Sequence, residues 1–223
     1  MLKELIAVWK GENFMNRVIK EFEQMLIDAE YVFTKAWLAC EGKLDINEHK
    51  QQLYDKDRSV NNHERGIRRK LAEHLSLNPR QDVAGCLAIM SLVKDAERIG
   101  DYSKNIFDLT LLYEDKINQL KYLKELANIH EQLSVSLPKL RKAFLGSDDI
   151  TAKEILKHYA PIKDACNKIL NDLFSENLSS KEAVATALLS RYLKRINSHL
   201  SNIASGIVYP LDQIDFVRGD LLE

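Results

Sequence analysis

Apolar residues recur every three or four positions along most of the chain, which is the spacing of amphipathic helices. Strand-like alternation is nearly absent, and the 223 residues include only 8 glycines and 4 prolines to interrupt the pattern. Six helices are predicted, at 15–40, about 45–75, about 79–112, about 117–144, 146 to about 174, and about 180–208. The pattern therefore predicts an all-α protein.

Local signals mark several of the helix ends. Gly42 is expected to end the first helix, and Asp45 to cap the second, with Glu48 three residues later as in a capping box. Asn78–Pro79 is interpreted as the start of the third helix, because proline is favoured at the first helical position. Pro138 lies inside the fourth helix and is expected to kink it.

Two segments of the chain repeat. The residues at 42–46 (GKLDI) are echoed at 146–150 (GSDDI), and those at 97–106 (ERIGDYSKNI) at 194–203 (KRINSHLSNI). Within the longer pair, four residues are identical at one constant offset, which indicates duplication of a structural unit: Arg98/Arg195, Ile99/Ile196, Asn105/Asn202 and Ile106/Ile203. The prediction is two tandem, pseudo-symmetric three-helix bundles: residues 1–112, including an N-terminal extension, and residues 113–223.

The composition narrows the class of protein. The chain carries 32 basic and 33 acidic residues, for a formal net charge of -1, so no basic excess favours nucleic acid or an anionic membrane as the partner. Its three cysteines are far apart in the sequence and form no C-x-x-C motif, which is typical of reduced core cysteines. No apolar run is long enough for a signal peptide or a membrane span. A cytoplasmic protein is expected.

Carboxylates interrupt two of the apolar seams. In the second helix, Asp57 and Glu64 take seam positions, with Asn61 beside them, in the series Leu53, Asp57, Val60, Glu64, Ile67 and Leu71. In the third helix, Glu97 and Asp101 fall on the apolar side. Buried carboxylates need compensation. Four readings remain open: pairing with Arg98, Arg68 or Lys104, raised pKa values with shared protons, a hard cation, or a seam that is solvated at this end.

The segment that carries two of these carboxylates resembles a known signature. LVKDAERIGDYSKNI at 92–106 is similar to the core motif of the PhoU family of phosphate-uptake regulators. Other matching pieces, in the same order, are NPRQD at 78–82, DRSVNNHE at 57–64 and the degenerate NIASGIVY at 202–209. The resemblance covers nearly the whole chain, including its duplication.

Membership in that family would imply two three-helix bundles and no enzymatic activity. It would also imply a cytoplasmic accessory role, coupling a phosphate transporter to a sensor histidine kinase and restraining uptake and phosphate-starvation signalling. The resemblance further implies one acidic site for iron, zinc, magnesium or manganese. Carried over residue by residue, the ligands are Glu97, Asp101, Asp57, Asn61 and Glu64. A homodimer is a further expectation.

The second copy departs from the motif, and other functions stay open. Lys194 and Ser198 stand where the first copy has Glu97 and Asp101, so at most one metal site is expected. One alternative is a soluble companion of a sodium–phosphate cotransporter. Another is an enzyme with a carboxylate-bridged metal pair, against which the absence of Glu-x-x-His argues. A third is an interaction scaffold without metal.

Overall fold

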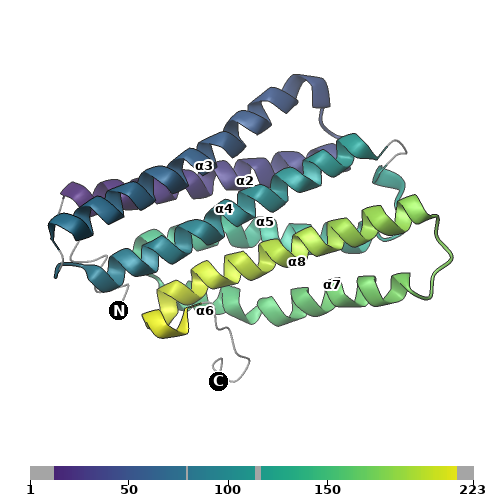
Figure 1. Cartoon of the computed structure of the whole chain (residues 1–223). Coiled ribbons are helices and arrows are strands. Elements are labelled where there is room, and N and C mark those ends of the chain that lie inside the picture. Colours follow the sequence, from purple (N-terminus) through teal and green to yellow (C-terminus); the bar gives the residue numbers. More distant parts are fainter. Residues whose placement is uncertain (1–12, 79, 114–116, 215–223) are drawn as a thin grey trace.

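The protein is a bundle of long helices, which a computed structural model describes over residues 13–78, 80–113 and 117–214 (Figure 1). The helices are α2 (Asn13–Cys40), α3 (Ile46–Leu77), α4 (Val83–Leu112), α5 (Leu123–Gly146), α6 (Asp149–Lys157), α7 (Tyr159–Leu173) and α8 (Ser180–Val208), with short 3-10 turns η1 (Ile117–Gln119) and η2 (Leu211–Gln213). These residues contain no strand, so the all-α prediction is confirmed. None of the described helices has the length and apolar character that crossing a membrane requires.

The predicted start of α3 is confirmed, whereas the predicted start of α4 is wrong. Asp45 caps α3, and its Oδ1 accepts hydrogen bonds from the backbone N–H groups of Asn47 (2.9 Å) and Glu48 (3.2 Å). Asn78 still closes α3, since its N–H donates to the carbonyl of His74. The helical conformation is unfavourable for a residue that precedes a proline. Asn78–Pro79 therefore ends α3 instead of starting α4. Pro79 itself lies outside the described residues.

Two further helix boundaries differ from the prediction. Residues 117–119 form the 3-10 turn η1, and α5 begins only at Leu123. The helix expected from Gly146 to about Phe174 is broken at His158 into α6 and α7. Pro161 accounts for the break, because it has no N–H to donate to the carbonyl of Lys157 and its ring clashes with that carbonyl in a continuous helix.

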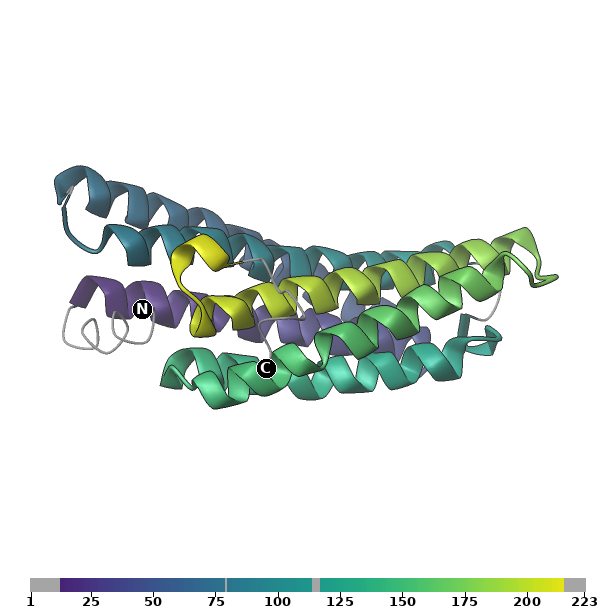
Figure 2. The same cartoon turned by 90° about the horizontal axis from the view of Figure 1, so that it is seen from below.

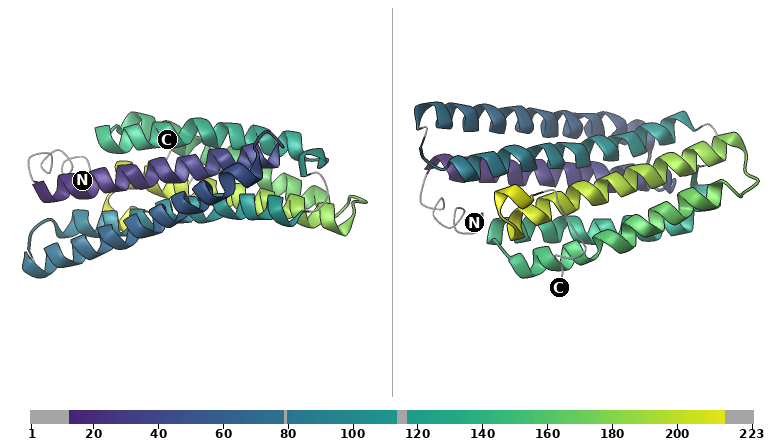
Figure 3. Two further views of the ribbon diagram at one scale, coloured as in Figure 1. Left: turned by 90° about the horizontal axis from the view of Figure 1, so that it is seen from above. Right: turned by 60° about the horizontal axis from the view of Figure 1, so that its bottom comes forward.

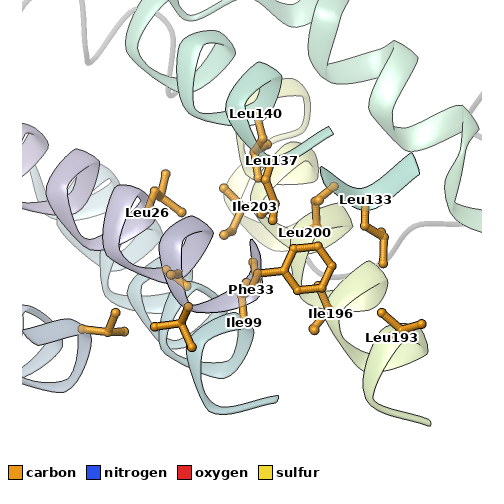
Figure 4. Packing of buried hydrophobic residues seen from close by; sticks show 14 of the residues in the cluster. Leu26, Phe33, Ile99, Leu133, Leu137, Leu140, Leu193, Ile196, Leu200 and Ile203 are labelled. Carbon is orange, nitrogen blue, oxygen red and sulfur yellow. The ribbon is translucent and has the colours of Figure 1, made fainter. Parts of the chain in front are cut away.

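The described helices pack around one core. Helices α2, α3 and α4 pack together, as do α5, α6, α7 and α8, while α4 also lies along α8 and α2 along α5 (Figures 2 and 3). At the centre, Phe33 of α2 lies among leucine and isoleucine side chains of α5 and α8 (Figure 4). The division into residues 1–112 and 113–223 therefore stays a prediction from the repeat, since both parts contribute to one buried cluster.

Gly206 allows the close approach of α8 to α4. A Cβ at this position would lie 2.8 Å from Cδ2 of Leu92, a side chain that is fully buried and has little room to move. We expect Gly206→Ala to lower the free energy of unfolding by about 1 kcal/mol. Overpacking costs about 1–3 kcal/mol, which exceeds the gain of about 1 kcal/mol in helix propensity. Urea denaturation measures the difference.

Gly146, the last residue of α5, is the matched control. A Cβ there would have no neighbour within 4 Å. Gly146→Ala should therefore raise stability by up to about 1 kcal/mol, because alanine restricts the unfolded chain. A Gly206→Ala variant as stable as Gly146→Ala would contradict the close packing of α4 on α8.

Candidate functional site

The candidate site lies where α3 and α4 pack against each other. The buried residues of α3 are the seam predicted from its sequence: Leu53, Asp57, Val60, Glu64, Ile67 and Leu71. Gly100 of α4 faces Val60, and a Cβ on Gly100 would come within 3.3 Å of that side chain. This contact brings the helices close together beside the carboxylates. Asp57, Glu64 and Glu97 are all less than a tenth exposed, so their predicted burial is confirmed.

Lysine and arginine side chains reach most of these carboxylates. Lys94 Nζ lies 2.8 Å from Glu97 Oε2 and 3.6 Å from Glu64 Oε1, and thereby joins α3 to α4. Arg98 pairs with Asp101 at 3.0 Å, and Arg68 with Glu64 at 3.4 Å. Ion pairing is therefore the main compensation in the seam, and it includes two of the three cations suggested by the sequence.

Raised pKa values supply a second form of compensation. Burial raises the pKa of Asp101 to about 6, the charge of Glu97 and a hydrogen bond with it add to the increase, and Arg98 opposes it. Burial likewise raises the pKa of Asp57, against the attraction of Lys104. Asp57 Oδ1 is buried and accepts no hydrogen bond from a described residue. The Asn61 amide does not reach it, because it donates to the backbone carbonyl of Asp57 at 3.1 Å.

These side chains do not form a closed metal site in their described positions. Within the described ranges, no three histidine, cysteine, aspartate or glutamate side chains are grouped so that they could hold a metal ion. Glu64, Glu97 and Asp101 face Lys94 and Arg98, and Asn61 is bonded to its own helix. A cation would have to displace ammonium or guanidinium groups, so metal binding at these five residues stays a prediction.

In the second copy, hydrogen bonds to neutral acceptors take the place of the acidic cluster. Lys194, in the place of Glu97, donates to Asn167 Oδ1 at 2.6 Å. Ser198, in the place of Asp101, donates to the carbonyl of Lys194 at 3.0 Å. Asn197, in the place of Gly100, donates to the carbonyl of Tyr159 at 2.9 Å. The local chemistry of the two copies therefore differs.

A buried polar cluster between α4 and α8 was not predicted. Asp95 Oδ1 lies 2.7 Å from Nδ1 of His199 and accepts a hydrogen bond from Asn202 at 2.8 Å. Tyr102 and His199, which occupy equivalent positions in the two copies, stack with ring centroids 5.8 Å apart. The sequence pattern that could have predicted this cluster is a second seam along α4. Its residues are all buried: Ala88, Leu92, Asp95, Ile99 and Ile106.

Comparison with known proteins identifies relatives of the chain. The PhoU domain family model matches residues 16–110 and 126–207. The phosphate-specific transport system accessory protein PhoU homolog 1 of Thermotoga maritima is 26% identical over 141 residues, which is 60% of this chain and 60% of that protein. This chain thus spans less than two thirds of that curated relative.

Solved structures share the fold. The crystal structure of PhoU from Pseudomonas aeruginosa superposes with a TM-score of 0.75 at 21% identity, covering 89% of this chain and 97% of that one. The phosphate transport system regulatory protein PhoU from Streptococcus pneumoniae gives 0.70 at 21% identity, covering 90% and 97%. The likeness at this identity concerns the fold alone. Because the family match covers more than half of the chain, at residues 16–110 and 126–207, the chain belongs to the PhoU domain family.

Proposed function

We propose that the chain is a cytoplasmic regulator of phosphate uptake and phosphate-starvation signalling that acts by docking rather than by catalysis. The observation that carries this proposal is the family match over residues 16–110 and 126–207. The names of the relatives, an accessory protein and a regulatory protein of phosphate transport, support it. The proposed partners are the cytoplasmic part of a phosphate transporter and a sensor histidine kinase.

The α3–α4 seam supports a docking role better than a catalytic one. Glu64, Glu97 and Asp101 are engaged by Lys94, Arg98 and Arg68, and Lys94 joins α3 to α4. A general acid or base must reach a substrate within hydrogen-bond distance, and a buried, ion-paired carboxylate does not. The contribution of the seam is therefore to stiffen a helical surface.

A cell lacking the gene tests this function. We expect phosphate uptake and a phosphate-starvation reporter to rise in phosphate-replete medium, and to return to normal when the gene is restored. An uptake change that appears only when sodium is present would favour the alternative partner, a sodium–phosphate cotransporter. Unchanged uptake and unchanged reporter activity in the deletion strain would overturn the proposal.

A cation site in the seam is a second proposal, which Asp57 favours. Its Oδ1 is buried without a hydrogen-bond donor, and Asp101 lies in the same charged neighbourhood on α4. Oxygen ligands of this kind suit iron, magnesium or manganese, and carboxylates also bind zinc. Such a cation would draw Asp57, Glu97 and Asp101 together and release Lys94 and Arg98 to solvent, with Glu64 and Asn61 at the edge of the site.

Metal content and thermal unfolding test this cation site. After dialysis against trace divalent ions, the wild type should retain stoichiometric metal, and Glu97→Ala/Asp101→Ala should lose it. Bound metal should also raise the unfolding temperature of the wild type relative to chelator, because a ligand that binds only the folded state stabilises it. The control is Glu154→Ala/Asp164→Ala, which removes two exposed carboxylates. Equal metal content in all three proteins would place any bound metal elsewhere.

A further inference from the structure

Helix α2 runs along α5 (Figure 2). A groove of about 800 Å³ lies between these two helices. Its walls come from the last two turns of α2 and the first half of α5. The residues that matter for its chemistry are Trp37, Glu41, Lys124, Glu125, His130 and Glu131. None of the five predicted metal ligands lines this groove, so it is separate from the candidate site between α3 and α4.

Stacked aromatic rings form the floor of this α2–α5 groove. The rings of Trp37 and His130 lie nearly parallel, with centroids 4.5 Å apart, and Phe33 packs against His130 at 4.5 Å. Burial lowers the pKa of His130 to about 4, so the imidazole is neutral at pH 7 and adds no positive charge. Trp37 is only 2% exposed and His130 is half-buried, so the floor is uncharged and held by packing on more than one side.

Carboxylates dominate the rim. Glu41, Glu125 and Glu131 face one lysine, Lys124. Glu41 pairs with Lys43 at 2.9 Å, whereas Glu125 and Glu131 are exposed and form no ion pair with a described residue. Because the net charge of the whole chain is only -1, this excess is a local feature of the groove.

The end of α2 adds to the negative potential. The carbonyl end of a helix carries a partial negative charge, which basic residues in the last turn usually offset. The last turn of α2 contains none, and the helix ends at Cys40 beside the groove. Rim carboxylates and helix end together favour a cation over any anionic ligand.

We propose that the α2–α5 groove binds a basic segment of a protein partner, seating an arginine side chain against the half-buried His130, whose ring stacks on Trp37, between Glu125 and Glu131. A guanidinium is more weakly hydrated than an ammonium and pairs well with carboxylates, and its methylene stem packs on apolar surface. The proposal deepens the regulatory function and rests on it for the biological role of the partner, but the binding chemistry stands on the groove itself.

Peptide binding to the full chain tests the proposal. The probe is a fluorescein-labelled peptide of alternating arginine and alanine, followed by anisotropy at low ionic strength. Glu125→Gln/Glu131→Gln should weaken binding about tenfold, equivalent to 1.4 kcal/mol. The control Glu73→Gln/Asp164→Asn removes the same charge from exposed positions on α3 and α7 and should change binding less than twofold. A lysine–alanine peptide should bind more weakly than the arginine peptide.

Tryptophan emission locates the bound peptide. The chain has two tryptophans, so Trp9→Phe leaves Trp37 as the reporter in the groove floor. An unlabelled arginine peptide should change the Trp37 emission with the same midpoint as the anisotropy. Unaltered emission at saturation, or equal weakening in the groove and control variants, would show a diffuse charge effect and overturn the proposal.

Two other outcomes would also reject the proposed occupant. Self-association that the groove variant abolishes, without peptide binding, would place a second copy of the chain there. Equal binding of a glutamate–alanine peptide would rule out charge recognition. Since the assay contains neither transporter nor kinase, its failure is distinct from failure of the reporter test, which addresses the regulatory role alone.

Discussion

Replacing Asp95 with alanine is expected to lower the free energy of unfolding by about 3 kcal/mol. Asp95 is 6% exposed, and one of its oxygens serves both His199 and Asn202 across the contact between α4 and α8. Alanine would leave the ring nitrogen and the amide without this partner in the interior. Each unsatisfied buried group costs about 1–3 kcal/mol, so losing the partner of two such groups costs about 3 kcal/mol.

Asp108 provides the control on the same helix. It also interacts with two groups, Lys104 Nζ at 2.7 Å and the Tyr54 hydroxyl at 2.8 Å, but its side chain is 31% exposed. Water can replace both interactions, so Asp108→Ala should cost about 1 kcal/mol. Urea denaturation of both variants under identical conditions measures the difference. Equal losses would mean that burial between α4 and α8 adds nothing to the interaction.

Periodicity predicted the seam of α3 because a single face of that helix is buried. Every seam position from Leu53 to Leu71 is found in the interior, including both carboxylates. The pattern did not show which groups balance the charge of the buried carboxylates. Lys94 follows Glu64 by thirty residues in the sequence, so their ion pair depends on the register of α3 against α4 and is not encoded in the spacing of either helix.

The start of α3 was predicted well because a side chain caps the backbone there, whereas the helix ends at Asn78–Pro79 and near Pro161 were predicted poorly. Asp45 has one available role, because its carboxylate can bond the exposed N–H groups of the helix that follows. Asn78–Pro79 is compatible both with the end of one helix and with the start of the next. Pro161 was overlooked because the apolar spacing continues across it through Ile162, Cys166 and Ile169.

Contacts between the two copies could not be predicted from either copy alone. α4 is buried on two faces, one toward α3 and one toward α8, so its hydrophobic pattern is broad and assigns no particular partner to Asp95. The α2–α5 groove has the same origin, since it exists only where a helix of one copy meets a helix of the other. Such sites depend on how the copies pack.

Burial of His130 is expected to make the protein less stable as the pH falls from 6.5 to 4. Burial lowers the pKa of His130 from 6.5 to about 4, so over this range the unfolded chain takes up a proton that the folded chain does not. Stability therefore decreases toward low pH. At 1.36 kcal/mol per pKa unit, the full effect is at most about 3 kcal/mol. His130→Phe should remove it while keeping an aromatic ring against Phe33 and Trp37.

The His130→Phe variant is needed because Asp101 changes the stability of the wild type with pH in the opposite direction. Its pKa is raised to about 6, so the folded chain holds a proton that the unfolded chain has lost, and stability decreases as the pH rises from about 4 to 6. The wild type should then show a shallow pH profile in which the two effects partly cancel. In His130→Phe the Asp101 effect remains, so its stability relative to wild type should grow steadily from pH 6.5 to 4. The control His158→Phe changes an exposed histidine and should follow the wild-type profile. A His130→Phe profile parallel to the wild-type profile would show that His130 takes up its proton equally in the folded and unfolded chains.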